Sequence, residues 1–270
     1  MMNVAATSAR ALAAGADGRS AGTTTARVEY VLRLADSSLL LGQRLSEWCG
    51  HGPILEEDIA LANMALDLIG QARLLLAHAG ALAGAGRDED ALAFLRSEDE
   101  YRNVTLVELP NEPGAHGTRD FARTVVRNFL FTSWQEQVWP RLQEGADTGL
   151  AAIAAKSAKE TRFHVRHSAD WVLRLGDGTD ESHARMQAAL DALWPFTAEL
   201  FSADAVDPDA GALQPEWEAR VRQVLAAATL TVPPCTPFRS HGKQGVHSEH
   251  LSHLLATMQY LQRTYPGARW

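Results

Sequence analysis

Apolar residues recur at intervals of three and four along most of the chain after Arg27, which is the spacing of a buried helix face. The first run, residues 28–49, stops at the breaker sequence Gly-His-Gly-Pro. The second run, residues 56–83, begins with three acidic residues, which suit the positive end of a helix dipole. It is apolar on most sides, so it predicts a helix at the centre of a bundle. Further helical runs cover residues 119–144, 150–175, 180–203, 215–229 and 246–264.

These runs predict an all-α fold, a four-helix bundle with additional C-terminal helices. No period-two run of β-branched residues extends past four positions, so there is no signal for a strand. Segments 97–117 and 231–245 are rich in polar residues, Pro and Gly and are expected to be long loops. Residues 1–26 carry mostly small and polar side chains and are expected to form a mobile tail. Residues 27–270 are expected to form one domain.

Composition and charge narrow the class of protein. Hydrophobic residues make up 46% of the chain and charged residues 21%, which is typical of a folded globular domain. The net charge of −8 argues against nucleic-acid binding, which needs a concentrated positive field. No run approaches the roughly 20 apolar residues of a membrane-spanning helix, and two cysteines build neither a disulfide framework nor a four-thiolate zinc site. We therefore expect a soluble, cytoplasmic protein with no membrane or nucleic-acid partner.

Long four-helix bundles often hold two irons, and the ligands of such a site have a recognisable spacing. Each of two helices supplies a carboxylate, and each of the other two supplies a Glu-x-x-His motif. None of the ten histidines has Glu three residues before it. The acidic variant Asp180-x-x-His183 lies at a predicted helix start, where Asp suits a cap. The chain therefore lacks the usual ligand set for two irons.

Two histidine patterns leave other metal sites open. Glu160 and His164 are four residues apart on one helix face, so the imidazole either bonds the carboxylate as a buried pair or shares a single metal with it. His167, one turn further on, is expected to face solvent or a partner. Near the C-terminus three histidines recur every three residues, a pattern that suits zinc or nickel but also a helix cap or an interface. These are His247, His250 and His253.

Two polar segments could meet a small anionic ligand. Residues 98–103 combine an aromatic side chain, a cation and an amide, a mixture suited to nucleotide-like ligands. Residues 239–245 form a glycine-flanked basic loop that could bind phosphate. Solvated surface is the alternative for both segments.

Several long motifs resemble one known family. They are QRLSEWCGH at 43–51, DIALANMALDLIGQAR at 58–73, LWPFTAELF at 193–201, and HSEHL and MQYLQR within 245–263. Together with shorter matches they resemble the structural C subunits of ring-1,2-phenylacetyl-CoA epoxidase, also termed phenylacetate-CoA oxygenase. The resemblance covers residues 27–270.

The resemblance implies a ferritin-like fold and a non-catalytic role beside a di-iron catalytic A subunit. In that family the A–C pair binds phenylacetyl-CoA, and a reductase with flavin and an iron–sulfur cluster delivers electrons from NADPH. The product is the ring-1,2-epoxide, formed during aerobic phenylacetate degradation. Partners of this chain would then be the A subunit, the other epoxidase subunits and phenylacetyl-CoA.

Comparison with the catalytic subunit implies a degenerate di-iron site in this chain. The positions that match metal ligands carry Ser38, Leu68, Gln71, Asn128, Thr161 and His164. Only His164 keeps a ligand side chain, and one neutral imidazole cannot balance the charge of two irons. The resemblance therefore implies no metal, no cofactor and no catalytic residue in this chain.

The resemblance also implies that the chain contacts the coenzyme A part of the substrate. This role falls on Glu100, Tyr101, Arg102 and Asn103, with contacts through the backbone as the form expected. Two other functions stay open: a self-sufficient metal-dependent oxygenase, and a ferritin-like binding or storage protein.

Overall fold

The computed structural model describes residues 5–112, 119–234 and 239–268, which are helical through most of their length and contain no strand. A single isolated β-bridge joins His241 and Val246. The long helices are α1 (Ala5–Ser46), α2 (Leu55–Ala83), α5 (Phe121–Gln143) and α6 (Thr148–Gly176). The shorter α-helices are α3 (Glu89–Phe94), α4 (Thr105–Glu108), α7 (Asp180–Leu193), α8 (Gln214–Ala227), α9 (Glu249–Met258) and α10 (Tyr260–Thr264). The 3-10 turns are η1 (Glu98–Glu100), η2 (Trp194–Phe201), η3 (Ala210–Leu213) and η4 (Gly242–Gln244).

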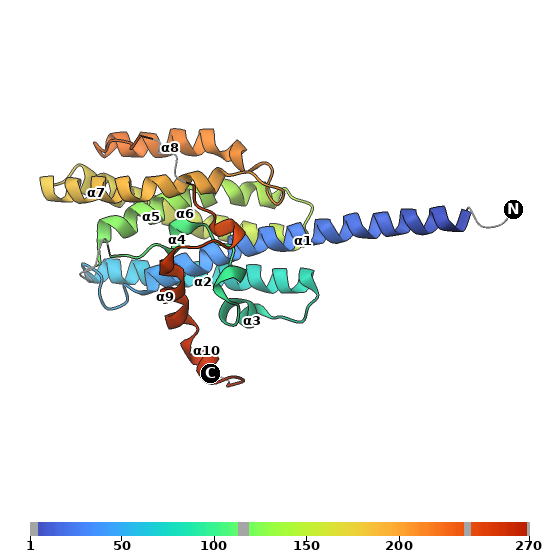
Figure 1. The fold of residues 1–270 in the computed structure, drawn as a ribbon. Helices are drawn as coiled ribbons and strands as arrows, with labels where there is room; N and C mark the ends of the chain where they lie inside the picture. The colour runs from blue at the N-terminus through green and yellow to red at the C-terminus, as the bar shows by residue number, and fades with distance from the viewer. Residues whose placement is uncertain (1–4, 113–118, 235–238, 269–270) are drawn as a thin grey trace.

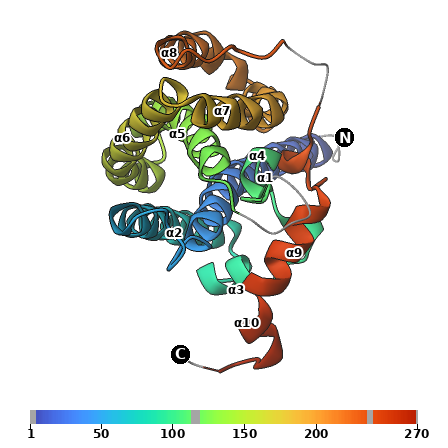
Figure 2. The same cartoon turned by 90° about the vertical axis from the view of Figure 1, so that its left-hand side faces the viewer.

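The four long helices form a bundle of two helical hairpins. α1 packs along α2, α5 packs along α6, and α2 meets α6 to join the two hairpins (Figure 1). α7 and α8 cover α5 and α6, whereas α9 packs against α4 and η1, and α10 follows α9 past α3 on the side away from α8 (Figure 2). This arrangement confirms the all-α fold and the additional C-terminal helices.

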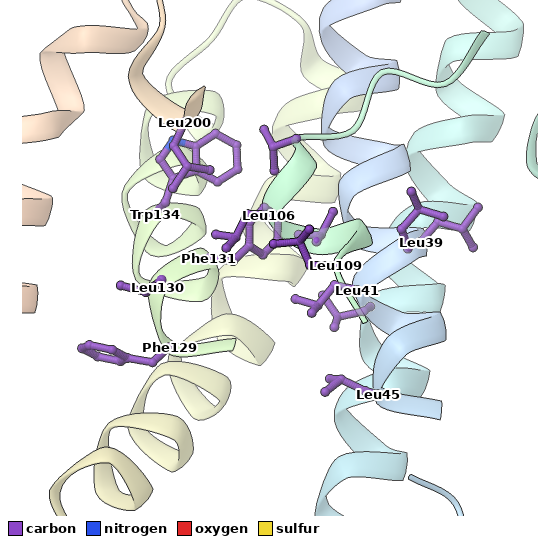
Figure 3. Packing of buried hydrophobic residues seen from close by; sticks show 14 of the residues in the cluster. Leu39, Leu41, Leu45, Leu106, Leu109, Phe129, Leu130, Phe131, Trp134 and Leu200 are labelled. Carbon is purple, nitrogen blue, oxygen red and sulfur yellow. The ribbon is translucent and has the colours of Figure 1, made fainter. Parts of the chain in front are cut away.

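The short helix α4 is buried in the core between two long helices. It contacts both α1 and α5, and its Leu106 and the following Leu109 lie between their apolar faces (Figure 3). Leu41 of α1 and Phe131 of α5 lie on either side of it and are fully buried. Because α4 fills the space between α1 and α5, a segment predicted as loop supplies part of the hydrophobic core.

Local capping signals account for where the helices begin and end. Asp120, Asp147 and Thr179 precede α5, α6 and α7, and each side chain accepts a hydrogen bond from a backbone N–H of the first turn. α2 ends at Gly84, whose φ of 64° is left-handed and costs a glycine little. These positions agree with the predicted helical runs.

α1 begins well before the run that predicts it. Its backbone is helical from Ala5, and its N-terminal part extends beyond the other helices (Figure 1). The segment predicted as a tail therefore continues the first helix from residue 5 onward, and its mobility stays a prediction.

α2 does not lie at the centre of the bundle, so that prediction is wrong. The enclosed helix is α5, most of whose side chains are buried. α2 exposes large apolar side chains, including Leu55 at 72% and Leu66 at 66%. By length and composition α2 is the one described helix that could cross a membrane, although 44% of the residues in that window are buried inside the protein.

The predicted loops contain short helical turns. Segment 97–117 includes η1 and α4, and segment 231–245 includes η4. Residues 113–118 and 235–238 of these segments lie outside the described part of the chain.

Candidate functional site

The interior of the bundle is the first candidate site. The predicted degenerate positions lie on all four long helices: Ser38 on α1, Leu68 and Gln71 on α2, Asn128 on α5, and Thr161 and His164 on α6. Each of these side chains is buried, with at most 2% of the residue exposed. The structure thus places all of them inside the bundle, and their equivalence to metal ligands stays a prediction.

Neutral groups hydrogen-bond to one another across this interior. Gln135 Nε2 donates to Ser38 Oγ at 3.2 Å and ties α5 to α1. Trp139 Nε1 donates to Thr161 Oγ1 at 2.9 Å and ties α5 to α6. These bonds satisfy buried polar groups without any charge.

His164 has a different partner from the one predicted. Its Nε2 lies 3.1 Å from Oδ2 of Asp67 on α2, not against Glu160. Glu160 instead accepts from Gln71 Nε2 at 3.0 Å and pairs with Lys156 Nζ at 2.7 Å. The imidazole is fully buried whereas the Asp67 side chain is 39% exposed, so the carboxylate lies at the rim of the bundle.

The interior does not fit two irons. Among the described residues, no three His, Cys, Asp or Glu side chains are grouped to hold a metal ion. The amide oxygens of Gln71, Asn128 and Gln135 are buried without a hydrogen-bond donor, yet they are neutral. Two buried iron ions need several anionic oxygens to offset their charge.

His167 does not face solvent as predicted. Its Nε2 lies 3.0 Å from Oε2 of Glu57 on α2, and both side chains are largely buried. This second pair between α6 and α2 joins residues 110 positions apart, so sequence spacing gave no sign of it.

The segment predicted to contact coenzyme A has two buried and two partly exposed side chains. Tyr101 and Asn103 are fully buried: the Tyr101 hydroxyl donates to the Ala93 carbonyl, and Asn103 Nδ2 donates to Glu108 Oε2 at 2.9 Å. Burial also raises the pKa of Tyr101 to about 12. Glu100 and Arg102 remain partly exposed. In this conformation the side chains of Tyr101 and Asn103 hold the fold and cannot reach a ligand.

The three C-terminal histidines do not form a common face. His247 precedes α9, and its Nδ1 lies 2.9 Å from Oε2 of Glu108 with both side chains fully buried. Burial opposes the charged imidazole, but the hydrogen bond and negative charge of Glu108 prevail and raise the pKa of His247. Burial and the nearby Arg44 and Arg123 instead lower the pKa of His250. Among the described residues the three imidazoles are not grouped to hold a metal ion, and the interface or helix-cap role stays a prediction.

Buried carboxylates around α4 are the feature that sequence reasoning missed. Asp36 pairs with Arg96 and accepts from the Arg102 backbone N–H at 2.9 Å. Glu199 accepts from the backbone N–H groups of Thr105 and Lys243, both at 2.9 Å. A signal existed for Asp36, because it stands within the apolar run of α1, where an acid needs a partner.

In the basic loop 239–245 Lys243 is turned toward the protein, whereas Arg239 and His241 are exposed. Lys243 is 5% exposed and its Nζ donates to the Ser202 carbonyl at 2.7 Å. Ser240 Oγ donates to Glu199 Oε2 at 2.6 Å. Lys243 is therefore used within the fold, and phosphate binding by the rest of the loop stays a prediction.

Comparison with known proteins gives the family. The sequence model described as "Phenylacetic acid catabolic protein" matches residues 8–270. The chain belongs to this family. The phenylacetic acid catabolic proteins are ferritin-like, in agreement with the all-α bundle.

A relative in this family supports the resemblance to the epoxidase C subunits. This chain is 49% identical over 250 residues to the C subunit of 1,2-phenylacetyl-CoA epoxidase from Escherichia coli strain K12. The match covers 89% of this chain and 98% of the relative. The similarity to an epoxidase C subunit, inferred from the motifs, is confirmed.

Proposed function

We propose that this chain is a non-catalytic structural subunit of a multicomponent ring-1,2-phenylacetyl-CoA epoxidase in aerobic phenylacetate degradation. It supports a di-iron catalytic A subunit and helps to bind phenylacetyl-CoA. A separate reductase with flavin and an iron–sulfur cluster supplies electrons from NADPH. The relative from Escherichia coli is named as the C subunit of an epoxidase, which supports membership of such a cytoplasmic assembly.

The neutral interior of the bundle is the observation that carries this proposal. Where a ferritin-like di-iron protein needs four carboxylates and two imidazoles, the matching positions offer hydroxyls, amides, a leucine and one imidazole. Leu68 is fully buried and packs as core. Replacing carboxylates by such groups removes the cost of burying unpaired charge in a site without metal.

The chain's own residues then act in positioning rather than in oxygen chemistry. His164 and His167 link α6 to Asp67 and Glu57 of α2 and so fix one hairpin against the other. For phenylacetyl-CoA, Glu100 and Arg102 are the residues of segment 100–103 that retain exposed surface. A side-chain contribution to coenzyme A binding would come from these two residues, beside the contacts expected through the backbone of the segment.

Substitution of His164 tests the non-catalytic role. In the assembled complex, His164→Ala should leave iron content and the turnover number unchanged. The isolated variant should lose stability by about 1–3 kcal/mol, because it leaves a cavity and removes the bond to Asp67. Abolished turnover at an unchanged melting temperature and unchanged KM for phenylacetyl-CoA would contradict the proposal.

A further inference from the structure

The interior of the bundle contains hydrogen-bond acceptors that no donor of the described chain reaches. Gln71 Oε1, Asn128 Oδ1 and Gln135 Oε1 are buried without a partner, and at most 2% of each residue is exposed. Folded proteins leave very few buried polar atoms unpaired, because such an atom gives up its bonds to water and gains nothing in return. These oxygens therefore indicate a bound group that donates hydrogen bonds.

His164 of α6 adds a fourth acceptor. Its Nε2 lies 3.1 Å from Asp67 Oδ2, and an ionised carboxylate only accepts, so Nε2 carries the ring proton. In the neutral ring Nδ1 is then an acceptor. Nδ1 is buried, and within residues 5–112, 119–234 and 239–268 it has no hydrogen-bond partner.

Helix periodicity brings the amides of α2 and α5 to the same part of the interior. Asn128 and Gln135 are seven residues apart on α5, so they share a face and lie about 10 Å apart along it. Asn128 Nδ2 lies 3.7 Å from Met64 Sδ on α2. Gln71 is seven residues beyond Met64, and it therefore lies on the same face of α2, two turns further along.

Contacts with α1 show that Gln71 and Gln135 lie at one level. Gly42 packs closely on α2, since a Cβ built there would lie 3.3 Å from Leu68 Cβ. Because α1 and α2 form an antiparallel hairpin, Ser38, one turn before Gly42, lies opposite the turn of α2 that contains Gln71. Ser38 Oγ accepts from Gln135 Nε2 at 3.2 Å, which brings Gln135 to this level.

α6 closes the same region. Glu160 Oε2 accepts from Gln71 Nε2 at 3.0 Å, so α6 passes beside this turn of α2. Ser157 and His164 are seven residues apart on one face of α6, and both are fully buried. Ser157 Oγ also lacks a partner among the residues that the structure describes. Side chains from all four long helices thus surround one polar region.

Water suits these acceptors better than a cation does. A buried water molecule makes about three hydrogen bonds and brings no charge into the interior. A buried cation would need an anion beside it. The carboxylates of Glu160 and Asp67 lie at the rim, with side chains 17% and 39% exposed, and both already have donors. Glu160 bonds Gln71 and Lys156, and Asp67 bonds His164.

We propose that ordered water molecules occupy the interior of the bundle and donate hydrogen bonds to the unpaired acceptors of α2, α5 and α6. These acceptors are Gln71 Oε1, Asn128 Oδ1, Gln135 Oε1 and His164 Nδ1. His164 then connects the water to Asp67 at the rim, because its two ring nitrogens bond to different groups. The inference goes beyond the proposed function and does not depend on it.

Oxygen-17 magnetic relaxation dispersion of the purified full-length chain counts long-lived buried water molecules. The double variant Gln71→Leu, Gln135→Leu removes two acceptors at one level and should release about two of these molecules. Gln143→Leu is the matched control, because Gln143 is exposed at the end of α5, and it should keep the number found in the unaltered chain. An unchanged number in the double variant, folded by circular dichroism, would overturn the inference.

A crystal structure of the unaltered chain at high resolution does not depend on how a variant folds. It should show water within about 3.2 Å of Gln71 Oε1 and Gln135 Oε1. A crystal soaked in thallium(I) acetate should show no anomalous density at these oxygens. Thallium density there would overturn the inference in favour of a monovalent cation. An interior without water density would overturn it in favour of amides that turn to pair with each other.

Discussion

Each carboxylate buried around α4 has its own donors. Glu108 is fully buried: His247 and Asn103 bond its side chain, and the backbone N–H of Ser248 donates to it at 2.6 Å. Removing one partner of a buried pair commonly costs about 3–5 kcal/mol, because the remaining charge stays buried. These residues therefore specify how the C-terminal segment packs on α4.

The His247–Glu108 pair predicts a pH-dependent stability. Because the pKa of His247 is raised in the folded chain, its contribution is fully present below the unfolded value of about 6.5. It is lost as the pH rises through the folded value. We expect His247→Gln to destabilise the chain strongly at about pH 6 and much less at about pH 9. Urea unfolding at both pH values measures this, and an equal loss at the two would contradict the pair's role.

Tyr101 and Arg102 are neighbours with opposite expected roles. Tyr101→Phe removes the hydroxyl that donates to Ala93 and accepts from Gln259 Nε2 at 2.9 Å, which should cost about 1–2 kcal/mol of stability. The KM for phenylacetyl-CoA in the assembled complex should not change.

Arg102→Ala should instead raise this KM with little effect on the melting temperature. If steady-state kinetics showed that Tyr101→Phe raises this KM and Arg102→Ala does not, Arg102 would not belong to the substrate site.

At the scale of elements, local sequence signals predict most of each long helix, whereas the short helix α4 and the pairs between helices depend on long-range contacts. The predicted run 56–83 differs from α2 by one residue at its start, since the acids and the terminal glycine mark its ends. α4 has no such signal, because its place depends on the distant partners Glu199 and His247, which bond to Thr105 and Glu108. The partners of His164 and His167 are likewise about 100 residues away, beyond any spacing rule.

The contact of η4 with α4 depends on a glycine. A Cβ at Gly242 would collide with the Asn103 carbonyl oxygen, so Gly242→Ala must push η4 away from α4. We expect a loss of about 1–3 kcal/mol and faster amide exchange in residues 243–251. Gly70→Ala is the matched control, because its Cβ meets nothing and alanine favours a helix by about 1 kcal/mol. Unchanged exchange in Gly242→Ala would show that η4 does not depend on this contact.

At the scale of the whole molecule, the bundle has two unlike sides. The α1 and α5 side is closed by α4 and the C-terminal helices through buried ion pairs, whereas α2 exposes large apolar side chains such as Leu55 and Leu66. Between them lies an interior of neutral polar groups. A side closed by short helices, an interior of neutral polar groups and a helix with exposed apolar side chains together suit a chain that stabilises a partner.

Iron analysis of the purified chain tests the central claim most directly. The chain expressed alone should contain no stoichiometric iron and show no phenylacetyl-CoA-dependent oxygen uptake. Oxygen uptake should appear only when the di-iron subunit and the reductase are added. Near-stoichiometric iron in the isolated chain, with oxygen uptake that needs no catalytic partner, would contradict the account and identify a metal-dependent oxygenase.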